Sequence, residues 1–407
     1  MDSNNPTLKN KTILVAGASV SGNTVAWWLA RQGFQVTVVE KANSFREGGQ
    51  NVDVRGAARQ VLRRMGLEQA AQRLTTGEQG TDWVDEQDHV IAHFAVKDIG
   101  EGPTAELEIM RGDLSRLLYE PTRQYATYRF GDSISALEQN EAGALVTFES
   151  GARERYDLVI IAEGVGSSTR EMLFPGENRP RYLNLTIAYF GIPGQDSDSP
   201  FARQYNTVGG RGATVKPGRD GRLHVYMGIY KRSQDEQTWP VEQQKSFLCE
   251  RFGRDGWEFS RILQGMVHTD DFYFDVLRQV KLKRWSKSRV VLTGDAAWCA
   301  TPLSGIGTSL AIVGGYVLAG ELAKSNDYGT AFATYERVMR PYVEEGQGVP
   351  QLVPRLLWPH TRLGLRLLRW AMRLASTPLL RKLFARFFLR DSTKIELPDY
   401  PLRAEAA

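Results

Sequence analysis

The sequence predicts an α/β protein with a parallel sheet, an interleaved antiparallel sheet and a C-terminal helical segment, and three observations support this. The chain opens with an apolar strand, a glycine-containing turn, a helix and a second strand within residues 11–40. Two further strand–turn–helix patterns follow at 156–170 and 290–310. Between them, from 183 to 283, apolar and polar residues alternate as they do in antiparallel strands. Together these patterns favour a mixed α/β fold.

The opening pattern has the form of a Rossmann-like dinucleotide site. A short apolar strand at 11–16 leads into Gly17, and a helix follows Gly22. The second strand ends at Glu40, close to the spacing that brings a carboxylate to a ribose hydroxyl. The middle glycine of the usual fingerprint is replaced by Ser19. Either the loop is slightly wider than usual, or the serine hydroxyl contacts phosphate.

The late pattern carries an acid and a helix start that suit a polar ligand. An apolar strand at 290–293 ends in Gly294 and Asp295, and a proline loop leads to Gly305 and Gly307, which open a long apolar helix. The carboxylate can accept hydrogen bonds from sugar-like hydroxyls. The free N–H groups of the helix start favour an electron-rich or anionic group. The alternative is a buried strand–turn–helix without a ligand.

The middle pattern is a strand of apolar residues that ends in Glu163 and Gly164, followed by a polar helix start at 167–168 and by Arg170. On its own it is equally consistent with another parallel strand and a capped helix behind it.

These three stretches, in this order, resemble the flavoprotein aromatic hydroxylases typified by para-hydroxybenzoate hydroxylase. Residues 17–22 with Glu40 resemble the FAD fingerprint of that family, 157–170 its middle Asp-Gly motif, and 294–295 with 302–307 its late Gly-Asp motif. The segments at 40–41, 46–50, 53–56 and 110–114 resemble still more closely the tetracycline-inactivating branch and its polyketide-tailoring relatives. The likeness covers roughly residues 10 to 345.

The resemblance implies FAD as cofactor. Glu40 would hold the adenosine ribose, 19–22 the pyrophosphate, Arg111 the flavin-side phosphate or ribityl chain, and Asp295 a ribityl hydroxyl. The full set expected at FAD is Gly17, Ser19, Val20, Ser21, Gly22, Glu40, Lys41, Arg46, Arg111, Gly294, Asp295, Pro302, Gly305, Gly307 and Thr308. Arg46 and Arg55 have an alternative as solvated charges near the second strand.

The chain departs from the family pattern at three positions. Ser19 replaces a glycine, Glu163 replaces the usual aspartate, and Ile306 stands where many relatives have glutamine. The longer Glu163 side chain puts cofactor gating at that motif in doubt. Ile306 leaves the backbone N–H groups in place, so flavin binding should survive.

The resemblance also implies a discontinuous organisation. The FAD-binding domain would comprise 1–76, 102–170 and 285–345, and the substrate domain 77–101 and 171–284. The substrate domain would contain strands near 183–192, 212–216, 223–230 and 271–283, a hairpin turn at 217–221 and a covering helix at 241–252. Residues 346–407 would form a C-terminal helical lid or packing segment.

The substrate site is expected on that antiparallel sheet. Gln204 and His224 are its best polar candidates, and Tyr226 is a further contact. Phe190, Tyr205 and Tyr230 would complete an apolar wall beside Tyr226. The run 223–229 resembles a strand that presents a substrate-contacting histidine in the tetracycline-inactivating branch. His224 is otherwise an ordinary strand residue.

The function implied is a monooxygenase that uses NADPH or NADH and O2 to hydroxylate or oxygenate a polycyclic or phenolic molecule, such as a tetracycline-like antibiotic or a polyketide, through a flavin C4a-hydroperoxide. No side chain is expected to act as catalytic acid or base, because the flavin performs the chemistry. A flavin-dependent oxidase on the same fold, or a non-catalytic flavoprotein that sequesters an antibiotic, stays open.

Composition and charge limit the cellular location and the binding partners that we expect for this protein. Two cysteines in 407 residues make neither a disulfide framework nor a metal cluster, so we expect a reducing, cytoplasmic location without a secretory signal and without a bound metal. The net charge of +4 is uneven: residues 351–390 carry eight Arg, one Lys and no acid, which leaves −5 for the rest. This pattern gives no general nucleic-acid surface.

The basic segment itself has leucine, tryptophan and phenylalanine at helical spacing with arginines between them. Pro354, Pro359 and Pro378 break it, so two helices are expected. Three interpretations remain open: a packed amphipathic helix with a basic outer face, a lid over the substrate channel, and attachment to an anionic membrane surface.

Overall fold

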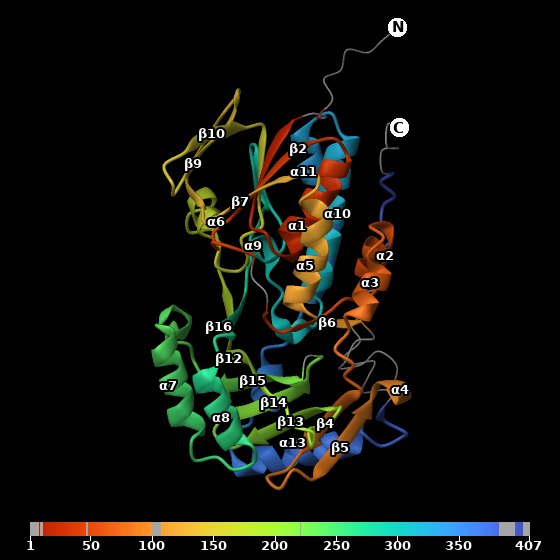
Figure 1. Ribbon diagram of the computed structural model, residues 1–407, viewed down its shortest axis with the longest axis vertical. Helices are drawn as coiled ribbons and strands as arrows, with labels where there is room; N and C mark the ends of the chain where they lie inside the picture. The colour runs from red at the N-terminus through yellow and green to blue at the C-terminus, as the bar shows by residue number, and fades with distance from the viewer. Residues whose placement is uncertain are drawn as a thin grey trace.

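The computed structural model describes residue 8 and residues 11–45, 48–99, 107–219, 221–381 and 395–401. Two lobes are stacked along the long axis of the molecule (Figure 1). The upper lobe is built on a six-stranded sheet and the lower lobe on a seven-stranded sheet. The predicted mixed α/β class is therefore confirmed.

The six-stranded sheet is parallel except at one edge. Its strand order is β17-β18-β11-β1-β2-β7. Its central strands are almost wholly apolar, because helices and a small sheet bury both faces. The strands are β1 (Thr12–Ala16), β2 (Gln35–Glu40), β7 (Thr127–Phe130), β11 (Leu158–Ile161), β18 (Val290–Leu292) and the antiparallel edge strand β17 (Ser286–Lys287).

Helices cover one face of this sheet, and the three-stranded sheet β10-β9-β8 lies on the other side of it (Figure 1). The central contact is between α1 and α10, where a Cβ on Gly315 would lie 3.0 Å from the backbone N of Val25. Glycine there lets the two helices approach closely. The elements are α1 (Val20–Arg31), α5 (Arg111–Thr122), α10 (Gly307–Lys324), α11 (Tyr328–Gly346), β8 (Ile134–Asn140), β9 (Gly143–Phe148) and β10 (Arg153–Tyr156).

The lower sheet has the order β16-β12-β15-β14-β13-β4-β5 and is mostly antiparallel. Helices α7 (Val241–Phe252) and α8 (Phe259–His268) bury one of its faces. Its strands are β4 (Gly80–Val84), β5 (Val90–Ala95), β12 (Arg181–Pro193), β13 (Ala202–Thr207), β14 (Arg211–Pro217), β15 (Arg222–Tyr230) and β16 (Phe272–Gln279).

Most of this lobe was predicted. The helix over 241–252 has the predicted bounds, and the four predicted strands are present as β12, β14, β15 and β16. Strand β13, which the sequence did not indicate, completes the sheet beside β4. The exact domain boundaries stay a prediction.

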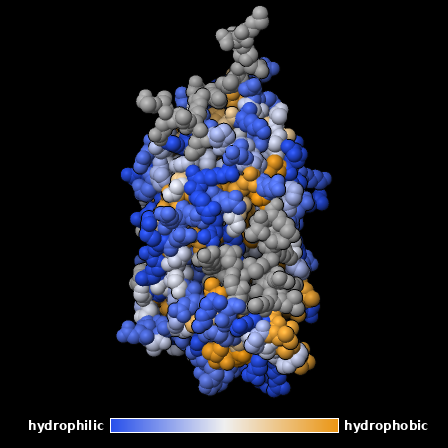
Figure 2. All heavy atoms as spheres, turned by 90° about the vertical axis from the view of Figure 1, so that its right-hand side faces the viewer, coloured by the Kyte–Doolittle hydropathy of each residue, from blue (hydrophilic) through white to orange (hydrophobic). Residues whose placement is uncertain are grey.

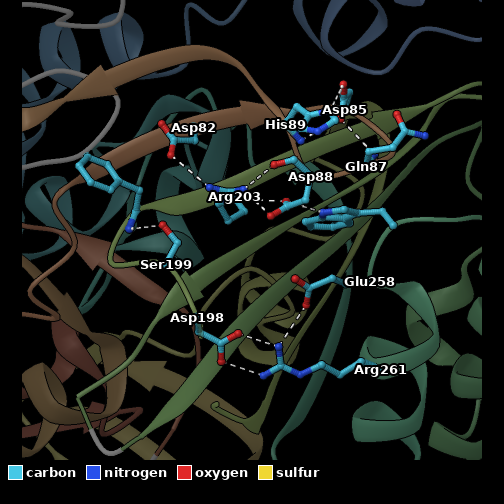
Figure 3. A network of polar contacts seen from close by, with 12 residues as sticks. Asp82, Asp85, Gln87, Asp88, His89, Asp198, Ser199, Arg203, Glu258 and Arg261 are labelled. Atoms are coloured by element: carbon cyan, nitrogen blue, oxygen red, sulfur yellow. Dashed lines mark hydrogen bonds and ion pairs between the residues drawn. The ribbon is translucent and has the colours of Figure 1, made fainter. Parts of the chain in front are cut away.

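An ionic network fixes the neighbouring strands β4 and β13 to the loops around them (Figure 3). The Arg203 guanidinium contacts Asp82 at 3.4 Å and also pairs with Asp88. The Trp257 indole N–H donates to Asp88 Oδ1 at 2.9 Å, which ties in the segment before α8. This network holds β4 and β13 in place without reaching the cavity described below.

Shorter elements connect the lobes and close their ends. Strands β3 (Asn51–Asp53) and β6 (Glu108–Met110) form a two-stranded ribbon. The remaining elements are α2 (Ala57–Arg64), α3 (Glu68–Arg73), α4 (Val96–Ile99), α6 (Ser168–Leu173), α9 (Asp295–Trp298) and the short 3₁₀ turns Glu236–Thr238 and Pro302–Ser304.

The C-terminal segment forms the two helices expected, α12 (Leu352–Leu357) and α13 (Arg362–Ala375), with Pro359 between them. The inner side of α13 packs against Ala92 and Phe94 of β5. Pro378 follows the end of α13, and 382–389 lie outside the described residues. None of the helices in the described ranges is long and apolar enough to cross a membrane.

Candidate functional site

A cavity of about 920 Å³ lies between the two lobes and is lined by residues of both. Its upper wall comes from the turn after β1, the ends of β2 and β11, and the loop before α10. Its lower wall comes from one face of the seven-stranded sheet. Most of the predicted FAD set lies on the upper wall: Gly17, Ser19, Val20, Ser21, Glu40, Arg111, Asp295, Pro302, Gly305, Gly307 and Thr308.

Two predicted glycines lie just behind that wall. A Cβ on Gly22 would be 1.8 Å from the carbonyl oxygen of Gly17, so only glycine lets α1 start this close to the turn. A Cβ on Gly294 would be 2.7 Å from the Ser21 side chain. Both shape the site without lining it.

Lys41 is exposed and does not line the cavity, and Arg46 lies outside the described residues.

The acid at the end of β2 is fixed by the chain around it. Glu40 accepts hydrogen bonds from the backbone N of Ala18 and of Ala42, each at 2.9 Å. A carboxylate has about four acceptor sites, so capacity remains for a ligand hydroxyl. The geometry suits the contact with a ribose that the sequence predicts.

Arg111, at the start of α5, faces the turn that follows β1. Its Nη1 donates to the Ser19 hydroxyl at 3.5 Å, while its Nε is buried with no hydrogen-bond partner among the described residues. Gly49, with φ +108°, leaves room for this side chain: a Cβ there would lie 3.0 Å from Nε. A half-buried guanidinium whose buried Nε has no partner fits an anionic ligand group.

The late motif surrounds the other part of the cavity. Asp295 starts α9 and is exposed to the cavity; desolvation by the protein around it raises the pKa of its carboxyl, while the nearby Arg111 opposes that rise. Gly305 has φ +67° and ends the 3₁₀ turn that precedes α10. The first N–H groups of α10, at Gly307 and Thr308, therefore lie at the cavity wall, where they can contact an electron-rich ring edge.

The side chains of Asn51 and Thr301, also on this wall, lack hydrogen-bond partners among the described residues. The unpartnered atoms are the amide nitrogen and oxygen of Asn51 and the hydroxyl of Thr301, whose φ is +85°. Buried polar groups nearly always have partners. Together with Arg111, these groups fit a polar ligand such as FAD, and neither Asn51 nor Thr301 was predicted.

Glu163 lines the cavity, but its carboxylate is hydrogen-bonded to residues close to it in the sequence. Its carboxylate accepts from the hydroxyls of Ser167 and Thr169, both at 2.6 Å, and from the Thr169 backbone N at 3.2 Å. The longer side chain thus caps the start of α6. Ile306, the third departure, is buried against Gly346 and leaves the α10 N–H groups exposed to the cavity.

The lower wall contains Gln204 and Tyr226, as predicted. The Tyr226 hydroxyl accepts from the backbone N of Asn51 at 2.6 Å, which joins the two lobes. Gln204 contacts Thr214 and donates to Asn206 Oδ1 at 3.3 Å. His224 is on the same side of β15 as Tyr226, two residues away, but lies beneath Gly218 of the hairpin and does not line the cavity.

The predicted aromatic wall is wrong in part. Phe190 and Tyr205 point to the opposite face, where they pack with α7 and α8, and Tyr230 does not line the cavity. The aromatic residues of the lower wall beside Tyr226 are Tyr189, Tyr273 and Trp358.

A buried ionic cluster also reaches this wall. Lys216 on β14 pairs with Glu78 at 2.9 Å and with Glu108 on β6. Arg55, for which one alternative was a solvated charge, is buried and pairs with Asp53 at 2.7 Å. The Lys216–Glu108 pair ties the sheet to the ribbon formed by β3 and β6. Among the described residues there is no cluster of His, Cys, Asp and Glu that could hold a metal ion.

A dinucleotide turn, a strand-end acid and a late acid before a helix start, gathered at one cavity, define an FAD-binding flavoprotein. Comparison with known proteins agrees: residues 10–346 match the FAD binding domain family. The chain belongs to this family and is an FAD-dependent monooxygenase, a class that takes electrons from NADPH or NADH.

The chain is 36% identical to the monooxygenase CTB7 of Cercospora beticola, over 96% of this chain and 98% of that protein. It is 32% identical to the FAD-dependent monooxygenase asL4 of Sarocladium schorii, with the same coverage of each chain. The crystal structure of tetracycline destructase Tet(55) superposes with a TM-score of 0.79 at 32% identity, covering 97% of this chain and 99% of that one.

Proposed function

We propose that this monooxygenase inserts oxygen from O2 into a planar polycyclic or phenolic molecule, of the tetracycline or polyketide kind. The observation that carries the proposal is a pair of buried donors on the lower wall. Tyr189 and Trp358 both line the cavity, and the buried Tyr189 hydroxyl and Trp358 indole N–H have no hydrogen-bond partner among the described residues. Such donors suit the carbonyl and phenolic oxygens of a polycyclic ligand.

The shape of the wall supports a flat ligand. Trp358 lies against Gly228, where a Cβ would be 2.9 Å from the indole nitrogen. The ring of Tyr226 lies 4.9 Å from that of Tyr189, and Tyr273 stacks on Tyr189 at 6.0 Å. Aromatic walls with a few placed donors bind aromatic ligands with a fixed orientation. The name of the structural relative Tet(55), a tetracycline destructase, points to the same class of substrate.

The upper wall would hold FAD, which supplies the chemistry that activates oxygen. Ser19 and the start of α1 would contact its pyrophosphate, Glu40 its adenosine ribose, and Asp295 its ribityl chain. Arg111 would place positive charge beside a phosphate. The N–H groups at the start of α10 would stabilise negative charge on the pyrimidine edge of the ring.

The protein's other contribution is exclusion of water. The segment around Trp358 is fastened to the sheet, because Gly209 N donates to His360 O at 3.0 Å and Gly210 N to Pro359 O at 3.1 Å. Trp358 therefore closes part of the cavity from a fixed position. A closed, apolar cavity protects a reactive oxygen species from side reactions.

A substrate screen tests the proposal. Purified enzyme with FAD, NADPH or NADH and O2 is incubated with tetracyclines, anthraquinones and simple phenols, and products are read by mass. We expect the mass of one oxygen atom to be added to a polycyclic compound. Steady NADPH consumption with peroxide release and no modified product from any class would favour an oxidase. Binding of a tetracycline without consumption would favour a sequestering flavoprotein.

A further inference from the structure

Helix α13 carries two apolar stripes on opposite sides. The inner stripe, Leu365, Leu368 and Met372, is buried on β5. The outer stripe consists of Leu363, Leu367, Trp370 and Leu374, which are 68%, 57%, 64% and 42% exposed. Its spacing of three and four residues places all four side chains on one side of the helix. Packing of α13 against the rest of the chain explains why the inner stripe is apolar, but it does not explain the outer stripe.

The position of α13 leaves the outer stripe open. Figure 1 shows the helix lying across the lower end of the molecule. Figure 2 shows hydrophobic side chains gathered among hydrophilic ones at that same end. The Arg369 side chain anchors the helix to the lower lobe through Glu86 at 3.0 Å. The outer face is thus presented outward by a helix that is itself firmly attached.

The charge beside the outer stripe has a single sign. Arg362, Arg366 and Arg373 are exposed on α13, and the sequence from 351 to 390 contains no acid. With 100° between successive residues, the three arginines form a row along one flank of the outer stripe. The helix therefore pairs an exposed apolar stripe with a continuous row of positive charge.

We propose that the outer face of α13 docks the protein onto an anionic lipid surface, with the helix lying in the plane of the interface. Leu side chains and a central Trp beside an arginine row are the composition of helices that bind at the headgroup boundary. A two-fold contact with a second copy in which the two α13 helices are antiparallel would bring the two arginine rows together. This docking function is independent of which substrate the cavity takes.

Vesicle co-sedimentation of the FAD-loaded enzyme tests the docking. We expect binding to vesicles of phosphatidylglycerol and phosphatidylcholine, and much weaker binding to phosphatidylcholine alone. The variant Leu367→Glu/Trp370→Glu should reduce partitioning by at least about tenfold, because it removes two apolar side chains and adds repelling charge. The variant Arg362→Gln/Arg366→Gln/Arg373→Gln should reduce it by about a hundredfold, at about fivefold per arginine.

The matched control is Met172→Glu, which changes an exposed apolar side chain on α6 in the upper lobe. It should bind vesicles like the unchanged enzyme. Bound FAD and the melting temperature report whether each variant is folded. Equal binding by all variants, or equal binding to neutral and anionic vesicles, overturns the proposal. So does a dimer in lipid-free solution that Leu367→Glu/Trp370→Glu dissociates, because the stripe would then bind a second copy.

Discussion

The two walls of the cavity are built in different ways. The upper wall is made largely of backbone: a turn that requires Gly17 and Gly22, the N–H groups that start α1 and α10, and a few acids at strand ends. The lower wall is made of side chains that stand on a sheet, such as Tyr189, Gln204 and Tyr226. Backbone sites are specified by short segments of sequence, whereas side-chain sites depend on which face of a strand is turned inward.

This difference predicts what a substitution in each wall does to ligand binding. A change in the upper wall should disturb the course of the chain and the binding of FAD. A change in the lower wall should leave FAD in place and alter only substrate binding. Four predictions follow this order, from the largest effect to the smallest.

Gly22→Ala should abolish FAD binding or folding. The added Cβ would lie 1.8 Å from the carbonyl oxygen of Gly17, which is backbone and cannot move aside without opening the turn. The measurement is the flavin absorbance of the purified protein together with its melting temperature. Gly256→Ala is the control, because no atom lies within 4 Å of the Cβ it adds. A yellow, normally stable Gly22→Ala protein would contradict the steric argument.

Arg111→Ala should weaken FAD binding by about tenfold to a hundredfold, since hydrogen bonds to charged groups contribute about 1.5–3 kcal/mol. Arg111→Lys should recover part of this loss, because it keeps the charge but not the fork of donors. Titration of the FAD-free protein, followed by flavin fluorescence, measures the affinity. Arg123→Ala, at the exposed far end of α5, serves as control. Equal affinity in Arg111→Ala and Arg123→Ala would remove Arg111 from the site.

The same contrast explains what could be predicted from the sequence. Gly17, Glu40 and Asp295 were identifiable because each lies at or just after the end of an apolar strand, and the ends of parallel strands meet at one edge of a sheet. The two helices after 350 were identifiable because prolines break the pattern between them. In these places a local rule determines the structure.

The lower wall could not be predicted in the same way. Strand β12 is buried on both faces at 185–192, so its sequence shows no alternation that would separate Tyr189 from Phe190. Trp358 lies 79 residues beyond Gln279, the last residue of the sheet, and reaches the cavity only through tertiary packing. Asn51 and Thr301 carry no sequence signal, since their importance follows from missing partners in the folded chain.

Tyr189→Phe should raise the KM for an accepted substrate by about two- to tenfold, the effect of one net hydrogen bond. FAD affinity should not change. The control is Tyr205→Phe, which removes the same hydroxyl from the opposite face of the sheet. Steady-state kinetics with the product identified in the screen measure both. Equal changes in the two variants would show that the effect is on the sheet as a whole, and loss of FAD from Tyr189→Phe would contradict its placement on the lower wall.

The smallest effect concerns the pH dependence of stability. Desolvation by the protein around it raises the pKa of Asp295 above its usual value of 3.8. As pH rises above 3.8, the unfolded chain loses this proton before the folded chain does, so this residue lowers the free energy of unfolding as pH rises through the folded pKa. Asp295→Asn removes that effect. In FAD-free protein, the stability of Asp295→Asn relative to the unchanged protein should therefore increase from pH 4 toward neutral pH.

Asp327, the N-cap of α11, should change the stability with pH in the opposite direction. Hydrogen bonds from Thr330 lower its pKa, so it stabilises the folded chain above its unfolded pKa, and this contribution is lost as pH falls. Asp327→Asn should accordingly lose stability relative to the unchanged protein as pH rises. Denaturant unfolding across the pH range measures both variants. Parallel pH profiles for Asp295→Asn and Asp327→Asn would mean that the folded protein already stabilises the Asp295 carboxylate before FAD binds, and would contradict its raised pKa.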